Sequence, residues 1–147
     1  MAIETRYGID EGVNCVFVER RGAFEAGSMV ATVAAIAATA DYAVGMNFFI
    51  DVTKMDYAEA SFANIFPNRA KWEMLAQSTG EIKIAFVDTT GKNFGTGRQS
   101  EILLSNDQIE RRPFKTAKEA LAWLEIGADY DTAAQFTQNV ADGAAEP

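Results

Sequence analysis

The chain has 147 residues, of which 48% are hydrophobic and 11% aromatic, and its formal net charge is −8 at pH 7. That length suffices for one domain with its own core, and the apolar content excludes general disorder. The acidic balance disfavours nucleic acid and anionic membranes as partners, because contacts with phosphate need clustered Lys and Arg.

One cysteine and no histidine are present. The single cysteine, Cys15, excludes an intrachain disulfide, and its place in the apolar run NCVFVE predicts a small buried side chain. The missing histidine excludes Ser-His-Asp and Cys-His nucleophiles, as well as the usual histidine-bearing zinc and haem sites. We therefore expect no cofactor and no metal.

The N-terminal residues MAIETRYGIDEG lack the basic segment and apolar run of a secretory signal. The longest apolar stretch, residues 29–40, has about half the length that spans a bilayer. We expect a cytoplasmic protein that does not insert into membranes.

In chain order, the first expected elements are a hairpin, a helix and a buried strand. Residues 3–9 and 14–20 are β-rich and flank the turn signal DEG, which predicts an antiparallel hairpin. Residues 22–40 predict a loop and a helix with apolar side chains at helical spacing. The compact apolar run NFFIDVT, residues 47–53, predicts a central strand buried on both faces.

The second half of the chain alternates helices with strands. Residues 56–78 predict two short helices, because Pro67 must end or kink a single long one. A strand over residues 82–88, the loop TTGKNFGTG and a helix over residues 99–106 follow. The strand expected over residues 109–115 is more polar, which indicates a place near an edge of the sheet.

The segment FKTAKEALAWLEI, residues 114–126, predicts a helix that covers one face of the sheet. Thr116 and Glu119 form a capping box at its start, a stripe of alanine and leucine residues follows at helical spacing, and Gly127 gives the stop signal.

Strand–helix alternation after a hairpin predicts an α/β fold. We expect a single domain over residues 1–127, with a mixed, mostly parallel sheet of about five strands covered by four or more helices. Residues 128–147 form an acidic, alanine-rich tail, which we expect to be mobile or loosely helical, with Phe136 and Val140 docked on the domain.

Four segments carry a family resemblance: VERRGAF, ADYAVGMNFFIDVTKMD, IKIAFVDTTGKNFGTGRQSEILLS and RPFKTAKEALAWL. In these segments and their order the chain resembles the small bacterial STAS-like (SpoIIAA-like) proteins. Their fold is shared with anti-sigma-factor antagonists and related to lipid-carrying CRAL-TRIO domains. The resemblance reaches residue 126 and implies the element order β-β-α-β-α-β-α-β-α. It also implies a non-enzymatic regulatory module that acts through protein contacts, as a monomer or a homodimer.

In phosphorylatable STAS domains an Asp ends the central strand and a D-S-S-G segment opens the next helix. The similar stretch here has Asp51 at the strand end and residues 59–62, EASF, in place of D-S-S-G. Ser61 thus matches the phosphoacceptor, although the first serine and the glycine of the motif are replaced. A phosphate at Ser61 would add charge to a partner-binding surface. The alternative is structural, since Asp56 and Glu59 also fit an ordinary helix cap.

The resemblance implies a partner surface at the expected helix start, Asp56, Glu59 and Ser61, and at the glycine loop, Phe94 and Gly95. The loop follows a strand and opens a helix, which can suit an anion, but its glycines match neither the P-loop nor G-x-G-x-x-G. Tight turning is the simpler role for these glycines.

Asp51, Asp56 and Glu59 leave two further hypotheses open. A hard metal such as magnesium or calcium would need more oxygen ligands than these three residues supply. An enzyme working through carboxylates alone would need Asp51 or Asp56 in a pocket with a raised pKa.

The aromatic residues allow a pocket as well as ordinary core packing. Phe62 and Phe66 are four residues apart and therefore neighbours on a helix, and Phe94 lies in the glycine loop. With Trp72 they could line a pocket for a small apolar molecule such as a fatty acid, at the edge of the sheet where ligands of α/β folds bind. A carrier or sensor is therefore the alternative function. The same rings could instead form a patch that dimerisation buries.

Overall fold

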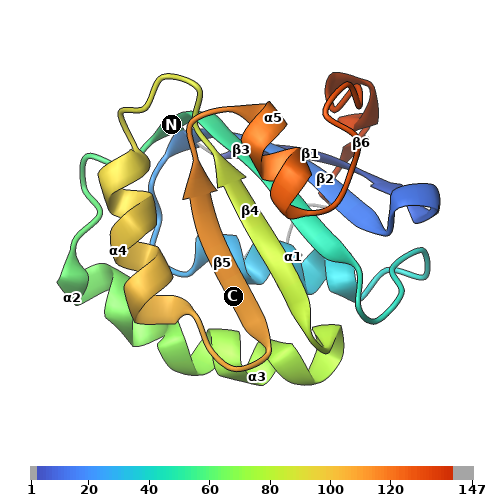
Figure 1. The fold of residues 1–147 in the computed structure, drawn as a ribbon. Helices are drawn as coiled ribbons and strands as arrows, with labels where there is room; N and C mark the ends of the chain where they lie inside the picture. The colour runs from blue at the N-terminus through green and yellow to red at the C-terminus, as the bar shows by residue number, and fades with distance from the viewer. Residues whose placement is uncertain (1–2, 141–147) are drawn as a thin grey trace.

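The computed structural model describes residues 3–140, which form a six-stranded sheet with helices on both faces (Figure 1). The strands are β1 (Glu4–Asp10), β2 (Cys15–Ala23), β3 (Asn47–Asp56), β4 (Ile82–Val87), β5 (Ile109–Phe114) and β6 (Gln138–Asn139). The α-helices are α1 (Ser28–Ala37), α2 (Phe62–Ile65), α3 (Arg69–Thr79), α4 (Phe94–Leu104) and α5 (Ala117–Trp123). Short 3-10 helices are η1 (Glu11–Val13), η2 (Phe66–Asn68) and η3 (Ala133–Gln135).

The strand order is β5-β4-β3-β2-β1-β6. β2 to β5 are parallel neighbours, whereas β1 is antiparallel to both β2 and β6. The expected α/β class and mixed, mostly parallel sheet are therefore confirmed, and so is the N-terminal hairpin. β5 occupies an edge, as its polar sequence predicted. The sheet has one strand more than the expected five, because β6 adds a short strand beyond β1.

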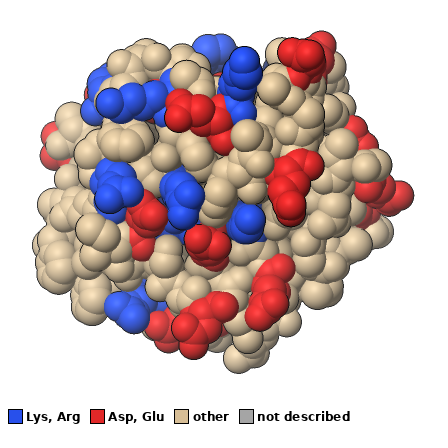
Figure 2. All heavy atoms as spheres, viewed as in Figure 1, with Lys and Arg blue, Asp and Glu red and all other residues tan. Residues whose placement is uncertain are grey.

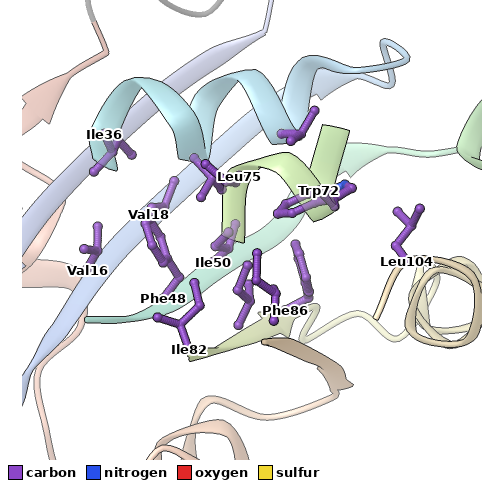
Figure 3. Close-up of a cluster of buried hydrophobic side chains, with 14 of the residues drawn as sticks. Val16, Val18, Ile36, Phe48, Ile50, Trp72, Leu75, Ile82, Phe86 and Leu104 are labelled. Carbon is purple, nitrogen blue, oxygen red and sulfur yellow. The ribbon is translucent and has the colours of Figure 1, made fainter. Parts of the chain in front are cut away.

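The larger core lies between the sheet and the helices α1 and α3. Val16 and Val18 of β2 point to this face together with Phe48 and Ile50 of β3 (Figure 3). Trp72 of α3 is only 2% exposed and extends over the sheet toward the carboxyl end of β4. Burying a large apolar side chain of this kind contributes roughly 1.5–3 kcal/mol, so this layer holds α1 and α3 in place.

A smaller core lies on the opposite face, under α5. Leu121 packs there with Phe17, and Cys15 is completely buried beside them, which confirms the prediction for the cysteine. Half of the predicted capping box is confirmed: the Thr116 hydroxyl accepts a hydrogen bond of 3.2 Å from the Glu119 backbone N–H. The Glu119 carboxylate accepts in turn from the Thr116 hydroxyl at 2.9 Å.

The segment after α5 also packs against the sheet, which differs from the mobile or loosely helical tail that we expected. β6 pairs with β1, and Tyr130 stacks on Phe17 with ring centroids 4.9 Å apart. Phe136 and Val140 pack against the two cores, in line with their expected docking. Residues 141–147 of the expected tail lie outside the described part of the chain.

A β-bulge near the carboxyl end of β2 and β3 shapes the functional end of the sheet. Glu19 pairs with Asp51, but Arg21 pairs with Lys54, so two residues of β3 lie opposite Arg20. Such a bulge bends the strand and changes the direction of the side chains that follow. Arg20 itself lies buried on the face that α1 and α3 cover.

Two helix starts differ from the prediction. β3 continues to Asp56 and α2 begins only at Phe62, so Asp56 and Glu59 do not cap that helix. α4 begins at Phe94 rather than at residue 99, although its first turn contains glycine, which is a poor helix former. Within residues 3–140, no helix has both the length and the apolar character needed to cross a membrane.

Candidate functional site

A pocket lies at the carboxyl ends of the parallel strands, on the face that α1 and α3 cover. Its walls are mainly apolar, and the volume of the cavity is about 80 Å³. The strands contribute Arg20, Val52, Met55, Phe86, Arg111 and Pro113. The helices contribute Met29, Val30, Trp72, Gly97, Ser100 and Leu104. Ligands of open α/β sheets bind at this edge.

Asp88 holds the loop between β4 and α4 that closes one side of the pocket. Its carboxylate accepts hydrogen bonds from the backbone N–H groups of Thr90 at 2.9 Å and Asn93 at 2.8 Å. The Asn93 side chain then donates to the carbonyl of Met55 at 3.0 Å, which ties the loop to β3. Burial alone would raise the pKa of Asp88, but these hydrogen bonds together lower it below its ordinary value. The protein's own carboxylate therefore occupies the place where this loop could have bound an anion.

α4 approaches β5 closely because Gly97 has no side chain. A Cβ atom on Gly97 would lie 2.7 Å from the Cβ of Pro113. Phe94, at the start of α4, lines the pocket, and the Lys115 ammonium lies 4.7 Å from the centroid of its ring. Close helix–strand packing, rather than the tight turn that we expected, is thus the role of Gly97, whereas Gly91 has the positive φ of a turn.

Arg111 of β5 is buried in the wall of the pocket. Its guanidinium carbon lies 4.7 Å from the ring centroid of Trp72 and 4.5 Å from that of Phe86. Its Nε and Nη1 atoms are buried and have no hydrogen-bond partner within the described residues. Burial lowers the pKa of Arg111 to about 10, and the nearby Tyr57 acts in the opposite direction. The guanidinium is thus packed by two rings but not neutralised.

Arg20 of β2 is also buried, with 2% of its surface exposed. Its guanidinium donates to the hydroxyl of Ser28, at the start of α1, and to the hydroxyl of Thr5 at 3.3 Å. Its Nη1 lies 3.5 Å from the sulfur of Met29. Burial lowers the pKa of Arg20, whereas the nearby Tyr57 and Glu25 act in the opposite direction.

Tyr57 follows β3 and joins Arg20 and Arg111 in lining the pocket. Burial raises the pKa of its hydroxyl, and the positive charges of both arginines act against that shift. Both guanidinium groups are therefore close enough to act on the same phenol. The pocket combines apolar walls with a polar end made of two cations and one hydroxyl.

Two of the four residues predicted to line an apolar pocket do so. Trp72 and Phe94 line the pocket, whereas Phe62 and Phe66 lie outside it. The latter two rings stack on each other at 5.2 Å with an interplanar angle of 7°, and they are 56% and 42% exposed. They form a surface feature because this segment directs Ile65 and Asn68 to the pocket and the two rings to solvent.

The carboxylates that we singled out serve local turns. Asp51 accepts a hydrogen bond of 2.8 Å from the Thr53 N–H, and Asp56 accepts one of 2.9 Å from the Ala58 N–H. Glu59 is exposed. Among the described residues, no group of three or more acidic or cysteine side chains could hold a metal ion.

Ser61 is the N-cap residue of α2 and is exposed. Its backbone N–H and its hydroxyl both donate to the side-chain oxygen of Asn64, at 2.6 Å and 3.1 Å. The exposure that a phosphorylated serine needs is thus present, and its modification stays a prediction. Gly95 is exposed on α4, with no atom within 4 Å of the place of a Cβ.

Sequence reasoning missed Arg20, Arg111 and Tyr57. The alternation of side chains along β2 and β5 could have indicated that both arginines are buried. Arg20 continues the face of Val16 and Val18, and Arg111 lies two residues after the buried Ile109. Side chains two residues apart point to the same face of a sheet, so an arginine in such a series is directed toward the core.

Compared with family models, with curated proteins and with solved structures, the chain matches none.

Proposed function

We propose that this protein is a non-enzymatic binding module that holds a small, mainly apolar molecule as a carrier or a sensor. The observation that supports this is the pocket at the carboxyl ends of β2 to β5, whose walls include the rings of Trp72, Phe86 and Phe94. Its volume suits a molecule of about six to ten non-hydrogen atoms. Of the small apolar molecules that the sequence suggested, a short one therefore fits better than a long fatty acid.

The STAS-like relationship belongs to the same proposal. The element order β1-β2-α1-β3-α3-β4-α4-β5-α5, with α2 before α3, supports it because this is the order that the resemblance implied. A cytoplasmic regulatory role, in which the bound molecule controls a protein partner, follows from that relationship as a further part of the proposal.

Filling the pocket tests the proposal. Ser100 lines the pocket from α4, so Ser100→Phe should place a ring in the space that a ligand needs. The measurement is the rise in Tm and the change in tryptophan emission with a panel of small aromatic and aliphatic compounds. We expect both responses in the unchanged protein and neither in Ser100→Phe.

Ile102→Phe is the matched control. Ile102 lies on the same helix and is 73% exposed, so this substitution adds a similar ring at the surface and not in the pocket. This variant should respond to ligands like the unchanged protein. If no compound of the panel raises the Tm of the unchanged protein, the proposal fails.

A protein-interaction module is the second candidate, and the exposed stacked pair Phe62 and Phe66 favours it. Large exposed rings in contact with each other are typical of binding surfaces. Phe62→Ser with Phe66→Ser should abolish concentration-dependent association in analytical ultracentrifugation if this pair forms a homodimer contact. An unchanged protein that stays monomeric at high concentration would argue against the homodimer.

A further inference from the structure

The polar end of the pocket contains more positive charge than the protein neutralises. Arg20 donates to two hydroxyl groups and a thioether sulfur, none of which is charged, and Arg111 has buried N–H groups without partners. Neither arginine forms a salt bridge with a carboxylate of the described residues. An unpaired buried cation is costly, and proteins keep such groups where a ligand supplies the missing charge.

The two acidic residues that line the pocket do not fill this role. The carboxylate of Asp88 is occupied by hydrogen bonds from its own loop, including one of 2.6 Å from the Thr90 hydroxyl. Glu25 is exposed to solvent and forms no salt bridge with Arg20, although its charge raises the pKa of that arginine. No carboxylate of the described residues therefore bonds to the free N–H groups of Arg111.

The rest of the pocket favours a ligand in which a carboxylate is attached to an apolar group. Trp72 and Phe86 pack around the guanidinium of Arg111, and apolar side chains form most of the remaining wall. A guanidinium matches the two oxygens of a carboxylate, and the Tyr57 hydroxyl can donate to the same group. The more highly charged phosphate would keep more of its oxygens without donors in so apolar a space.

We infer that the pocket binds a small organic acid, whose carboxylate accepts hydrogen bonds from the unpartnered N–H groups of Arg111 in a pocket that Arg20 also lines, and whose apolar part contacts Trp72 and Phe86. This inference rests on the proposed function, since it names the chemical class of the molecule that the same pocket holds.

Matched pairs of acids and amides test it, because each pair differs mainly in charge. Benzoate with benzamide and hexanoate with hexanamide are titrated into the unchanged protein by calorimetry. We expect each acid to bind roughly tenfold or more tightly than its amide, because charge-assisted hydrogen bonds are the stronger ones. Amides that bind as tightly as the acids would overturn the inference and leave the proposed function standing. If neither member of any pair binds, both fail.

Substitutions of the arginines test which residues distinguish an acid from its amide. Arg111→Met and Arg20→Met should each reduce the acid-to-amide ratio to near one while keeping the affinity for the amide. Arg112→Met is the control, because Arg112 is the next residue of β5 and its side chain is 43% exposed. A ratio that stays high in both pocket variants would overturn the inference.

Inorganic phosphate that binds more tightly than the acids would overturn the assignment to a carboxylate. The comparison in the unchanged protein remains decisive if either variant fails to fold.

Discussion

At the scale of single residues, Arg111 shows a conflict between stability and binding. Its guanidinium lies between the rings of Trp72 and Phe86, within 4.7 Å of both centroids. The attraction between the cation and the rings offsets part of the desolvation cost of burying the charge. Two of its nitrogens nevertheless remain without hydrogen bonds inside the described structure. Residues kept for binding often destabilise the empty protein in this way.

Replacing Arg111 by methionine should therefore stabilise the protein without ligand. Methionine keeps much of the side-chain volume and needs no hydrogen bonds, so we expect Arg111→Met to raise the free energy of unfolding by about 1 kcal/mol or more. In a chain of this size that corresponds to a Tm higher by about 3 °C. Calorimetry would measure the shift, and Arg112→Met should leave Tm nearly unchanged. A lower Tm in Arg111→Met would show that the cation is already well compensated.

Asp88 predicts a specific dependence of stability on pH. Its pKa is lowered in the folded protein, so its stabilising effect is present above the unfolded pKa of about 4 and is lost as the pH falls through the folded value. Asp88→Asn replaces one of two carboxylate oxygens that together accept three hydrogen bonds, and it should cost about 1–3 kcal/mol near neutral pH.

Urea unfolding between about pH 3 and pH 7 would measure this dependence. The difference between Asp88→Asn and the unchanged protein should shrink toward the acid end. The exposed Asp107 supplies the control variant, Asp107→Asn, which should follow the unchanged protein throughout. A difference that stays constant down to about pH 3 would show that the charge of Asp88 does not matter.

At the scale of elements, the C-terminal segment depends on one glycine of β1. A Cβ atom on Gly8 would lie 2.0 Å from the carbonyl oxygen of Gln135 in η3. Gly8→Ala should therefore displace η3 and β6 and leave the rest of the sheet intact. Hydrogen exchange should become faster in residues 130–140 but not in β3 or β4. Gly95→Ala adds its methyl group where no atom lies within 4 Å, and it should show no such effect. Unchanged protection of residues 130–140 in Gly8→Ala would contradict the close packing.

Elements with strong local patterns could be predicted from the sequence. The hairpin, β3, β4 and α5 carry alternation, a compact apolar run or a capping box, and each forms close to its expected place. β6 could not be predicted, because two residues contain no pattern and their strand exists only through pairing with β1. The start of α4 at Phe94 depends on the loop that Asp88 holds, a contact invisible to local propensity.

The site was harder to predict than the fold. Trp72 and Phe94 could be selected because aromatic rings stand out in a sequence. The exposure of Phe62 and Phe66, with Ile65 between them in the pocket wall, could not be foreseen. Arg20 and Arg111 went unnoticed because a charged residue in a strand usually faces solvent. Their burial depends on α1 and α3 covering the whole face, which is a property of the assembled fold.

At the scale of the whole molecule, the surface and the pocket differ in charge. Lys and Arg are interspersed with Asp and Glu over the face that carries β4 and β5 (Figure 2). The chain as a whole is acidic, with a net charge of −8, whereas the lining of the pocket contains two buried arginines. An organic acid would thus approach an acidic protein and bind beside a buried arginine.

This difference predicts an unusual effect of salt. Salt screens the long-range repulsion between the acid and the protein but acts only weakly on buried charges. Raising the ionic strength from about 0.01 M to 0.15 M should therefore leave the affinity for benzoate unchanged or increase it. The affinity for benzamide serves as the uncharged reference in the same titrations. Strong weakening of benzoate binding by salt would indicate exposed lysines and arginines as the binding site.

The most direct test of the binding pocket is a nuclear magnetic resonance titration with benzoate, in which the two tryptophans serve as internal probes. Trp72 lies in the pocket wall, whereas Trp123 packs against Phe114 under the opposite face of the sheet, with ring centroids 5.5 Å apart. The indole N–H signal of Trp72 and the Nε–H signal of Arg111 should move together as benzoate is added, while the indole signal of Trp123 stays in place. Movement of the Trp123 signal alone, or of neither indole, would contradict a ligand site at Arg111.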